Sequence, residues 1–322
     1  MKRVLIIAYY WPPSGGGGVQ RWLKFTRYLP EFGWQPIVYT PENANYPDID
    51  PSLEAEVNPD VQVIRYPIWE PYALYQKFQG KKKDEQVNPG FFEDRQKQSV
   101  TKKLSIWIRG NLFIPDARKF WIKPSVKFLV NYLKEHPVDV IVSTGTPHSM
   151  HVIGQKVHQK TGIPWVADFR DPWTGIEFYD QLMLTSWADR KHRQLEKSVV
   201  QGADALTTVS WHWAEDFQKM GAKHVKVLTN GFDEANFQHE PPPKFPQFTL
   251  AHLGTFAGDR NPETLWKVLA ELRNSSPDFK KDFRLLLAGK TDADIFRALD
   301  QYGLLEVTED KGYLPHEEAI KL

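Results

Sequence analysis

The stretch VLIIAYYWPPSGGGGVQRW, residues 4–22, decides the fold. Its first eight residues form an apolar run that Pro12 and Pro13 end, which suits a buried strand and is far too short to cross a bilayer. Gly15 to Gly18 follow directly, and an amphipathic stretch begins near Gln20. A strand, a glycine loop and a helix in this order predict the start of an α/β domain with a parallel sheet.

The same alternation of short apolar runs and longer amphipathic stretches continues along the chain. We expect strands at Val4–Tyr10, Gln35–Tyr39, Val61–Tyr66, Val138–Ser143, Trp165–Asp168, Ala205–Val209 and Lys226–Leu228, and helices at Gln20–Pro30, Ser125–Glu135, Met150–Thr161, Leu182–Val200 and Trp213–Met220. Each apolar run is short enough for a strand that helices cover on both faces.

A proline-rich stretch divides the chain. At 322 residues the length suggests about two domains, and Pro241 to Pro243 with Pro246 can continue neither a helix nor an inner strand. We predict a first domain at 1–240, a linker at 241–248 and a second α/β domain at 249–322. The second domain should hold strands at Thr249–Leu253, Phe283–Ala288 and near Val307, and helices at Asn261–Asn274 and Ala293–Gln301. With about 75 residues it is short for an α/β domain, so we expect a chain truncated at its carboxyl end.

The composition excludes several classes. The chain has 41 Lys and Arg, 40 Asp and Glu, and no cysteine. Near-neutral charge argues against general nucleic-acid binding, and the lack of cysteine excludes disulfides, a thiolate nucleophile and a thiolate zinc site. Nothing points to an oxidising compartment, so we expect a cytoplasmic protein. No apolar stretch approaches the roughly 20 residues of a membrane helix, and any membrane contact should be peripheral.

The glycine loop is the first candidate site. Glycines let a ligand approach the backbone, and the helix that follows presents its positive end, which suits an anion or a sugar hydroxyl. The loop matches neither G-x-G-x-x-G nor a P-loop. A flexible turn with no ligand is the alternative.

Two further candidate sites follow predicted strands. In STGTPHSMH, residues 143–151, His148 could act as a base, a hydrogen-bond donor or a sugar-binding group, or could only cap or pack a helix. Its spacing from His151 also resembles part of a metal site, without a third ligand. In ADFRDPWT, residues 167–174, Asp168 and Asp171 flank Arg170 and could bind sugar hydroxyls, orient a histidine or transfer protons. The alternative is an internal ion pair that fixes the loop.

A fourth candidate site combines TNGFD, residues 229–233, with HLGTFAGDRNP, residues 252–262. Glycines beside a helix start and a nearby arginine suit a diphosphate, although Asn-Gly is also a common turn. Asp48-Ile-Asp50 and Asp292-Ala-Asp294 mimic a metal-binding D-x-D motif, and we interpret both as solvated loops.

Residues 65–125 form a basic aromatic segment, with 13 Lys and Arg against 6 Asp and Glu. The lysines and Arg109 alternate with aromatic residues in an insertion at about 67–123. Cations with amphipathic aromatics are typical of proteins that bind an anionic lipid surface. An ordinary solvated insertion whose aromatics pack on the first domain is the alternative. The members that carry this interpretation are Trp69, Tyr72, Tyr75, Lys77, Phe78, Lys81, Lys82, Lys83, Phe91, Phe92, Lys102, Lys103, Trp107, Arg109, Phe113 and Trp121.

As an ordered set these motifs carry a resemblance. YYWPPSGGGGVQRWLKFTRYLPEFGW, VSTGTPH, GIPWVADFRDPW, TNGFD and HLGTFAGDRNPETL, in this order, resemble bacterial nucleotide-sugar glycosyltransferases of the GT-B fold, specifically retaining family 4. The similarity spans essentially the whole chain. It implies two Rossmann-like domains, the first binding the acceptor and the second, here incomplete, the nucleotide sugar.

The resemblance also implies roles for individual residues. The donor would contact Gly17, Gly18, Asn230, Gly254, Thr255 and Arg260, and the acceptor Gly16, Gln20, Arg21 and Arg170, while His148, Asp168 and Asp171 are the catalytic candidates. Transfer would retain the anomeric configuration and serve cell-surface polysaccharide or glycolipid synthesis. It would need no metal or other cofactor, since the nucleotide sugar is a substrate. The partners would be that donor, a glycan or lipid-linked acceptor and, through residues 65–125, the inner face of the cell membrane.

Two departures from the family pattern matter. Many relatives carry a histidine where this chain has Thr144, four residues before His148. The family's pair of donor-site glutamates, seven residues apart, should follow GYLPHEEA, residues 312–319, and the chain ends at Leu322 before it. This polypeptide could therefore be inactive. A non-catalytic sugar-binding or lipid-binding module and, more weakly, a sugar-nucleotide epimerase are the alternative functions.

Overall fold

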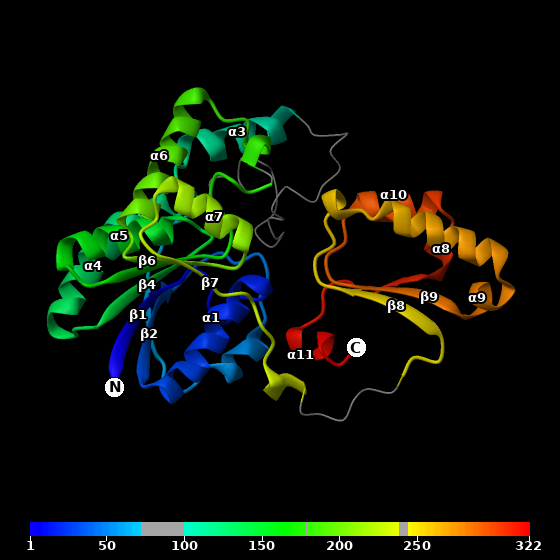
Figure 1. Ribbon diagram of the computed structural model, residues 1–322, viewed down its shortest axis with the longest axis horizontal. Coiled ribbons are helices and arrows are strands. Elements are labelled where there is room, and N and C mark those ends of the chain that lie inside the picture. The colour runs from blue at the N-terminus through cyan, green and yellow to red at the C-terminus, as the bar shows by residue number, and fades with distance from the viewer. Residues whose placement is uncertain (72–99, 178, 238–243) are drawn as a thin grey trace. The chain divides into compact units, whose positions relative to one another are not determined.

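The computed structural model describes residues 1–71, 100–177, 179–237 and 244–322. They form two compact units, the first ending at Phe232 and the second running from Asp233 to Leu322 (Figure 1). The predicted linker at 241–248 lies partly outside these ranges. Residues 72–99 of the basic aromatic segment lie wholly outside them. The predicted domain boundaries therefore stay predictions.

The first unit is built on a seven-stranded sheet in the order β3-β2-β1-β4-β5-β6-β7, with every pair parallel. Its strands are β1 (Lys2–Ile7), β2 (Trp34–Pro41), β3 (Gln62–Tyr66), β4 (Val140–Gly145), β5 (Trp165–Phe169), β6 (Ala205–Thr208) and β7 (Val225–Val227). Its helices are α1 (Gly17–Tyr28), α3 (Val100–Leu112), α4 (Lys119–Glu135), α5 (Ser149–Thr161), α6 (Ser186–Gly202) and α7 (Trp211–Met220), with short 3-10 helices η1 (Leu29–Phe32), η2 (Pro51–Glu56), η4 (Tyr179–Leu182) and η5 (Glu234–Phe237), the last at the start of the second unit.

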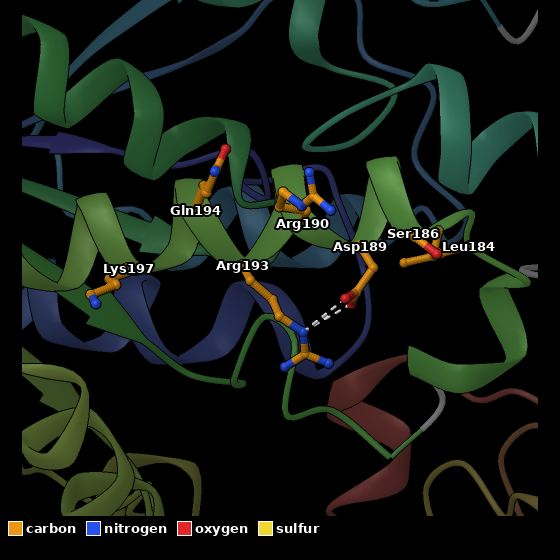
Figure 2. Close-up of a pocket in the computed structure, with 7 residues that line it drawn as sticks. All are labelled: Leu184, Ser186, Asp189, Arg190, Arg193, Gln194 and Lys197. Atoms are coloured by element: carbon orange, nitrogen blue, oxygen red, sulfur yellow. Dashed lines mark hydrogen bonds and ion pairs between the residues drawn. The ribbon is translucent and has the colours of Figure 1, made fainter.

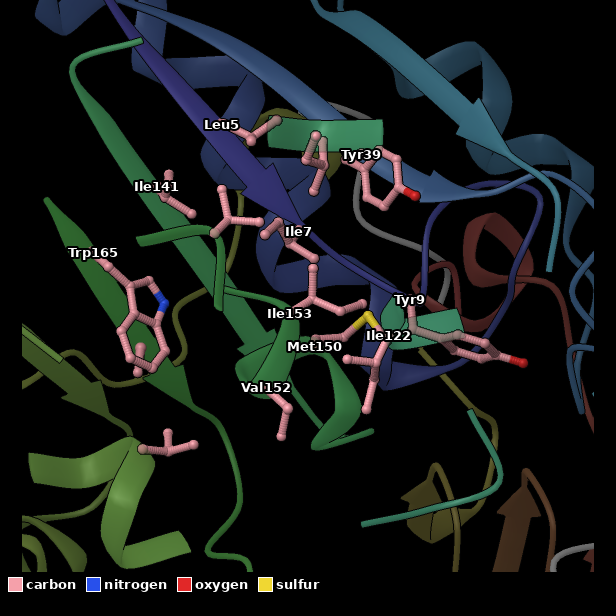
Figure 3. Close-up of a cluster of buried hydrophobic side chains, with 14 of the residues drawn as sticks. Leu5, Ile7, Tyr9, Tyr39, Ile122, Ile141, Met150, Val152, Ile153 and Trp165 are labelled. Carbon is pink, nitrogen blue, oxygen red and sulfur yellow. The ribbon is translucent and has the colours of Figure 1, made fainter. Parts of the chain in front are cut away.

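Alternate residues of β1 belong to two separate hydrophobic cores. Val4 and Ile6 pack with α1, whereas Leu5 and Ile7 pack with α4 and α5 on the other face (Figure 3). Because successive side chains of a strand point to opposite faces, an unbroken apolar run is what a sheet covered on both faces requires. The strand order reverses between β1 and β4, which is the arrangement of a doubly wound sheet.

The second unit repeats this pattern on a smaller scale. It holds a parallel sheet in the order β10-β9-β8, from β8 (Phe248–Leu253), β9 (Phe283–Ala288) and β10 (Thr308–Asp310). Its helices are α8 (Glu263–Ser275), α9 (Pro277–Asp282), α10 (Ala293–Gln301) and α11 (His316–Ala319), with 3-10 turns η6 (Gly258–Arg260) and η7 (Leu305–Val307). Trp266 and Leu269 of α8 pack with Ile295 and Leu299 of α10 over β9.

The predicted α/β class with parallel sheets is confirmed, and the differences from the predicted elements are local. The first strand ends at Ile7 rather than Tyr10, and α4 begins at Lys119, six residues before the predicted Ser125. Helix α3 was not expected at all. None of the helices in the described ranges combines the length and the hydrophobicity that crossing a membrane would require.

Candidate functional site

The residues predicted for the first unit's site gather at one edge of its sheet. The glycine loop follows β1, His148 follows β4, and Arg170 and Asp171 follow β5. Since the strands are parallel, these loops leave the sheet at its carboxyl edge. Open α/β sheets bind ligands at this edge, beside the point where the strand order reverses.

The glycine loop is anchored at its start and crowded at its end. The Gly15 N–H donates to the Asp48 carbonyl oxygen at 2.9 Å, and Gly16 adopts a left-handed φ of 78°. A Cβ on Gly17 would meet open space, whereas one on Gly18 would lie 3.1 Å from the Tyr10 ring. Gly16 offers α1 no side-chain cap, and the first N–H groups of a helix have no partner within it. Donor binding by Gly17 and Gly18 stays a prediction.

Arg170, in the loop after β5, donates hydrogen bonds to the start of α1 and to the end of β4 and the residue after it. Its Nη1 donates to the carbonyl oxygen of Gly18 at 2.6 Å, its Nε to that of Gly145 at 3.0 Å and its Nη2 to that of Thr146 at 2.8 Å. The guanidinium thereby fixes the loop after β5 to the start of α1 and to the end of β4, so the geometry makes this residue, predicted to bind the acceptor, a positioning residue. All three of these bonds go to neutral backbone groups.

Asp168 lies beneath these loops and is almost fully buried, with a side chain that is 1% exposed. Its carboxylate accepts five hydrogen bonds: two from Arg21 at 3.1 and 3.3 Å, and one each from Trp22, Thr144 and Thr207. Burial would raise the pKa of this carboxyl, but the charge and hydrogen bonds of Arg21 and the other hydrogen bonds lower it below its usual value. Asp168 is the centre of an internal ion-pair network.

Arg21 extends this network to the end of the first unit. Its Nη1 donates to Asn230 Oδ1 at 3.1 Å and lies 3.5 Å from the Thr229 carbonyl oxygen. Two residues predicted to bind different substrates, Arg21 and Asn230, thus contact each other. Gln20, the neighbour of Arg21 on α1, is half-buried.

Asp171 differs from Asp168 in both exposure and pKa. It is half-buried, and its pKa is raised, because burial outweighs the opposing charge of Arg170 and a hydrogen bond with Thr146. A carboxyl group whose pKa is raised and which retains some access to solvent is suited to proton transfer.

His148 and His151 are buried side by side. The His148 ring stacks on Trp173 with centroids 4.6 Å apart, and its Nδ1 is buried without a partner among the described residues. Ser143 Oγ accepts from Trp165 Nε1 at 2.8 Å and lies within hydrogen-bond distance, 2.9 Å, of His151 Nδ1. Burial lowers the pKa of His148 well below its usual value and that of His151 to about 3, so both rings are neutral at physiological pH.

Three polar residues that support this edge were missed by the sequence analysis. Asp116 caps α5, accepting from the Ser149 N–H at 2.8 Å and the Ser149 hydroxyl at 2.9 Å. Glu196 of α6 accepts from the N–H groups of Trp173 and Thr174, and His192 accepts from Trp173 Nε1 at 3.1 Å. Burial raises the pKa of Glu196 and lowers that of His192. No local motif marks these residues, because each acts on a segment at least 19 residues away along the chain.

In the second unit, a glycine with a positive φ follows each of the three strands. Gly254 (φ 115°) follows β8, Gly289 (φ 140°) follows β9 and Gly312 (φ 63°) follows β10. The Gly289 N–H donates to the Gly312 carbonyl oxygen at 2.7 Å, and a Cβ on Gly289 would overlap the Gly254 carbonyl. The predicted Gly254, Thr255 and Arg260 are exposed at this edge. Gly289 was missed, although it stands directly after an apolar strand as Gly254 does.

The interpretation of the two D-x-D sequences as solvated loops is wrong for one aspartate in each, because that aspartate is buried. Asp50 is buried and caps η2, accepting from the Ser52 N–H at 3.1 Å, while Asp292 is buried and caps α10, accepting from the Asp294 N–H at 2.9 Å. A short polar side chain at a helix start satisfies N–H groups that have no partner within the helix. Across the described ranges no cluster of three or more His, Asp or Glu could hold a metal ion.

The basic aromatic segment is only partly described. Trp121 is buried in the first core, as the alternative of an ordinary insertion expects, but Trp69 and Phe120 are exposed and contact each other with centroids 4.9 Å apart. Lys119 lies 5.3 Å from the Phe120 ring centroid and 5.6 Å from that of Phe113. The aromatic and basic residues between 72 and 99 lie outside the described ranges.

Residues 105–231 match the family model of the glycosyl transferase 4-like domain. The match covers less than half of the chain, but it contains β4 to β7 and with them His148, Asp168, Arg170 and Asp171. No curated protein sequence matches the chain.

Solved structures share the fold over nearly the whole chain. Sucrose-phosphate synthase from Thermosynechococcus elongatus matches with a TM-score of 0.56 and 15% identity, over 99% of this chain and 73% of the other. HepE from Anabaena, in complex with UDP and glucose, matches with a TM-score of 0.53 and 14% identity over 99% and 71%, and a glycosyltransferase from Rickettsia africae with 0.51 and 12% over 97% and 68%. The fold is GT-B, with two Rossmann-like units in one chain, and that prediction is confirmed.

Proposed function

We propose that this chain is a retaining family 4 glycosyltransferase that transfers a sugar from a nucleotide-sugar donor to a glycan or lipid-linked acceptor. The observation that carries the proposal is the match of residues 105–231 to the glycosyl transferase 4-like domain, because this range holds the loops after β4 and β5 at the carboxyl edge of the first sheet. The complex of HepE with UDP and glucose supports a nucleotide-sugar donor.

Most of the catalytic effect would come from positioning and from charge stabilisation at the leaving diphosphate. Backbone N–H groups at Gly17 and Gly18, together with Gly254, Thr255 and Arg260, would contact the donor. The acceptor hydroxyl would attack on the face that the diphosphate leaves, and a diphosphate oxygen would help to accept its proton, which retains the configuration.

The two aspartates would have different tasks. Asp168 donates no hydrogen bond and its acceptor capacity is taken by protein groups, so its proposed task is to hold α1 and the strand ends in place. Asp171, with its raised pKa, and the neutral His148 are the proposed groups that contact the reacting hydroxyl. Gln20 and Gly16 would contact the acceptor, and Asn230 the donor.

The site of action we propose is the cytoplasm, at the inner face of the cell membrane, in cell-surface polysaccharide or glycolipid synthesis. The chain has no cysteine, so no disulfide requires an oxidising compartment. The exposed pair Trp69 and Phe120, with Lys119 beside it, supports a peripheral contact with an anionic lipid surface.

Nucleotide binding and turnover test the proposal. UDP titrated into the protein by calorimetry should bind, and Arg260→Ala should weaken that binding by about 1.5–3 kcal/mol, the range for a hydrogen bond to a charged group. Arg284→Ala is the matched control, because Arg284 lies at the amino end of β9, away from the strand-end glycines. Equal UDP affinity for wild type and Arg260→Ala would refute the donor assignment.

Turnover separates the alternative functions. Sugar transfer from a nucleotide sugar to an acceptor supports the transferase. Interconversion of the nucleotide sugar without an acceptor would instead indicate an epimerase, and acceptor or lipid binding that does not depend on Arg260 would indicate a non-catalytic module.

A further inference from the structure

A groove of about 610 Å³ runs along α6, and it includes none of the residues predicted from sequence for the site. Its lining comes from α6 and the turn before it (Figure 2). Ser186, Arg190, Arg193 and Lys197 recur at intervals of three or four residues, and such residues share one face of a helix. The opposite face of α6, with Ala188, His192 and Val199, is buried against the first unit.

The exposed face of α6 is strongly cationic. Arg190, Lys191, Arg193 and Lys197 are all exposed within two turns, and the carboxylates of the same stretch do not balance them. Glu196 is buried, and Asp189 is paired with Arg193 through hydrogen bonds of 2.9 and 3.1 Å that lower the pKa of Asp189. Within the described part of the chain, neither Arg190 nor Lys197 has an ion-pair partner.

Large apolar side chains are exposed at the start of the same helix. Trp187 is 59% exposed and lies seven residues before Gln194, which places it beside the groove, and Met183 just before the helix is 39% exposed. The Met183 carbonyl oxygen accepts from Asn111 Nδ2 at 3.2 Å, so the turn that carries these residues is held against α3.

We propose that the α6 face, made of Met183, Trp187, Arg190, Lys191, Arg193 and Lys197, docks on an anionic lipid bilayer. Phosphate-bearing headgroups fit a groove with two cations that have no ion-pair partner among the described residues. A tryptophan with an apolar body and a polar N–H fits the depth at which headgroups meet acyl chains. The proposal concerns a surface outside residues 65–125, and it does not depend on whether the protein transfers sugars.

Vesicle sedimentation with the full chain tests this assignment. The protein should bind vesicles of equal parts phosphatidylcholine and phosphatidylglycerol, and salt should weaken the binding. Arg190→Gln combined with Lys197→Gln should reduce the affinity about 30-fold, since each charge near an anionic surface contributes about a fivefold factor. Lys127→Gln with Lys134→Gln is the matched control: both lysines are exposed on α4 with the same spacing of seven, and their loss should leave the affinity unchanged.

A second pair of variants tests the apolar part. Trp187→Ala should weaken vesicle binding, whereas Trp211→Ala should not, because the exposed Trp211 starts α7 beside the acidic Glu215 and Asp216. Equal binding to pure phosphatidylcholine vesicles, or unchanged binding by both α6 variants, would overturn the proposal. Binding of inorganic phosphate without any vesicle binding would make the groove a site for free anions and would also overturn it.

Discussion

Asp168 and Asp171 are three residues apart, yet their surroundings shift the pKa values of their carboxyl groups in opposite directions. Asp168 is surrounded by donors, so its ionised form is favoured and stabilises the fold at neutral pH. Asp171 is half-buried, and Arg170 and Thr146 do not offset the loss of hydration, so its ionised form is disfavoured. A sequence with two aspartates flanking an arginine predicts neither assignment, because the donors to Asp168 come from α1, β4 and β6.

Replacement of Asp168 by asparagine should destabilise the protein strongly. The Asn amide would point a donor at groups that are themselves donors, and Arg21 would be left buried without its counter-charge. We expect the free energy of unfolding to fall by about 3–5 kcal/mol in urea titrations. Asp189→Asn, which breaks an exposed pair with Arg193, should cost less than about 1 kcal/mol. Similar losses in the two variants would contradict the buried network.

Asp171→Asn should leave the stability intact and lower the turnover. A folded-state pKa above the unfolded value means that ionised Asp171 costs stability at neutral pH, so a neutral amide should leave the free energy of unfolding unchanged or raise it. If Asp171 transfers a proton, turnover of the nucleotide sugar should fall about 100-fold to 10,000-fold. Lost stability with full turnover would identify a structural residue instead.

At the scale of elements, the strands were predictable because each one is a short apolar run between turns. Alternate residues of such a run pack into the two cores on opposite faces of the sheet. Helix α3 was not predictable, because its Lys102, Lys103 and Arg109 continue the charge pattern of the basic aromatic segment, which is typical of a solvated insertion. The stacking of His148 on Trp173 was also out of reach, since it depends on how the loops after β4 and β5 are placed relative to each other.

The close approach of β8 and β9 in the second unit predicts a sharp effect of one methyl group. In Gly289→Ala the new Cβ would overlap the Gly254 carbonyl, and alanine disfavours a φ of 140°. We expect a loss of about 3 kcal/mol or more in the free energy of unfolding, with weaker UDP binding. Gly303→Ala shares a positive φ but points into open space, and it should cost only about 1–2 kcal/mol. Equal costs would show that strain, not crowding, matters at Gly289.

At the scale of the whole molecule, three buried histidines predict how stability depends on pH. Burial lowers the pKa values of His148, His151 and His192, so the unfolded chain binds more protons than the folded one below about pH 6.5. Stability should therefore fall as pH falls, by about 2 kcal/mol in total between about pH 7.5 and about pH 6. Asp171 and Glu196 act in the opposite direction: their pKa values are raised in the folded chain, so stability gains from them as pH falls from the folded values toward the unfolded values of 3.8 and 4.5.

Urea titrations across that pH range check this prediction. His151→Asn should remove one of the protons that unfolding takes up, because the pKa of His151 lies near 3 in the folded protein. Stability that is constant down to about pH 6 would show that the pKa values of the three histidines are not lowered in the folded protein.

The hydrogen bonds of Arg21 also constrain the order in which the first unit can be completed. Arg21 stands near the amino terminus, while Asp168 lies 147 residues and Asn230 lies 209 residues further along the chain. During synthesis, Arg21 of α1 lacks its ionic partner Asp168 until β5 has been made, and it has its full set of contacts only after the ribosome has passed residue 230. Contacts between such distant segments form late because closing the intervening chain costs entropy. The carboxyl edge of the sheet is thus assembled last, by the first helix to be synthesised.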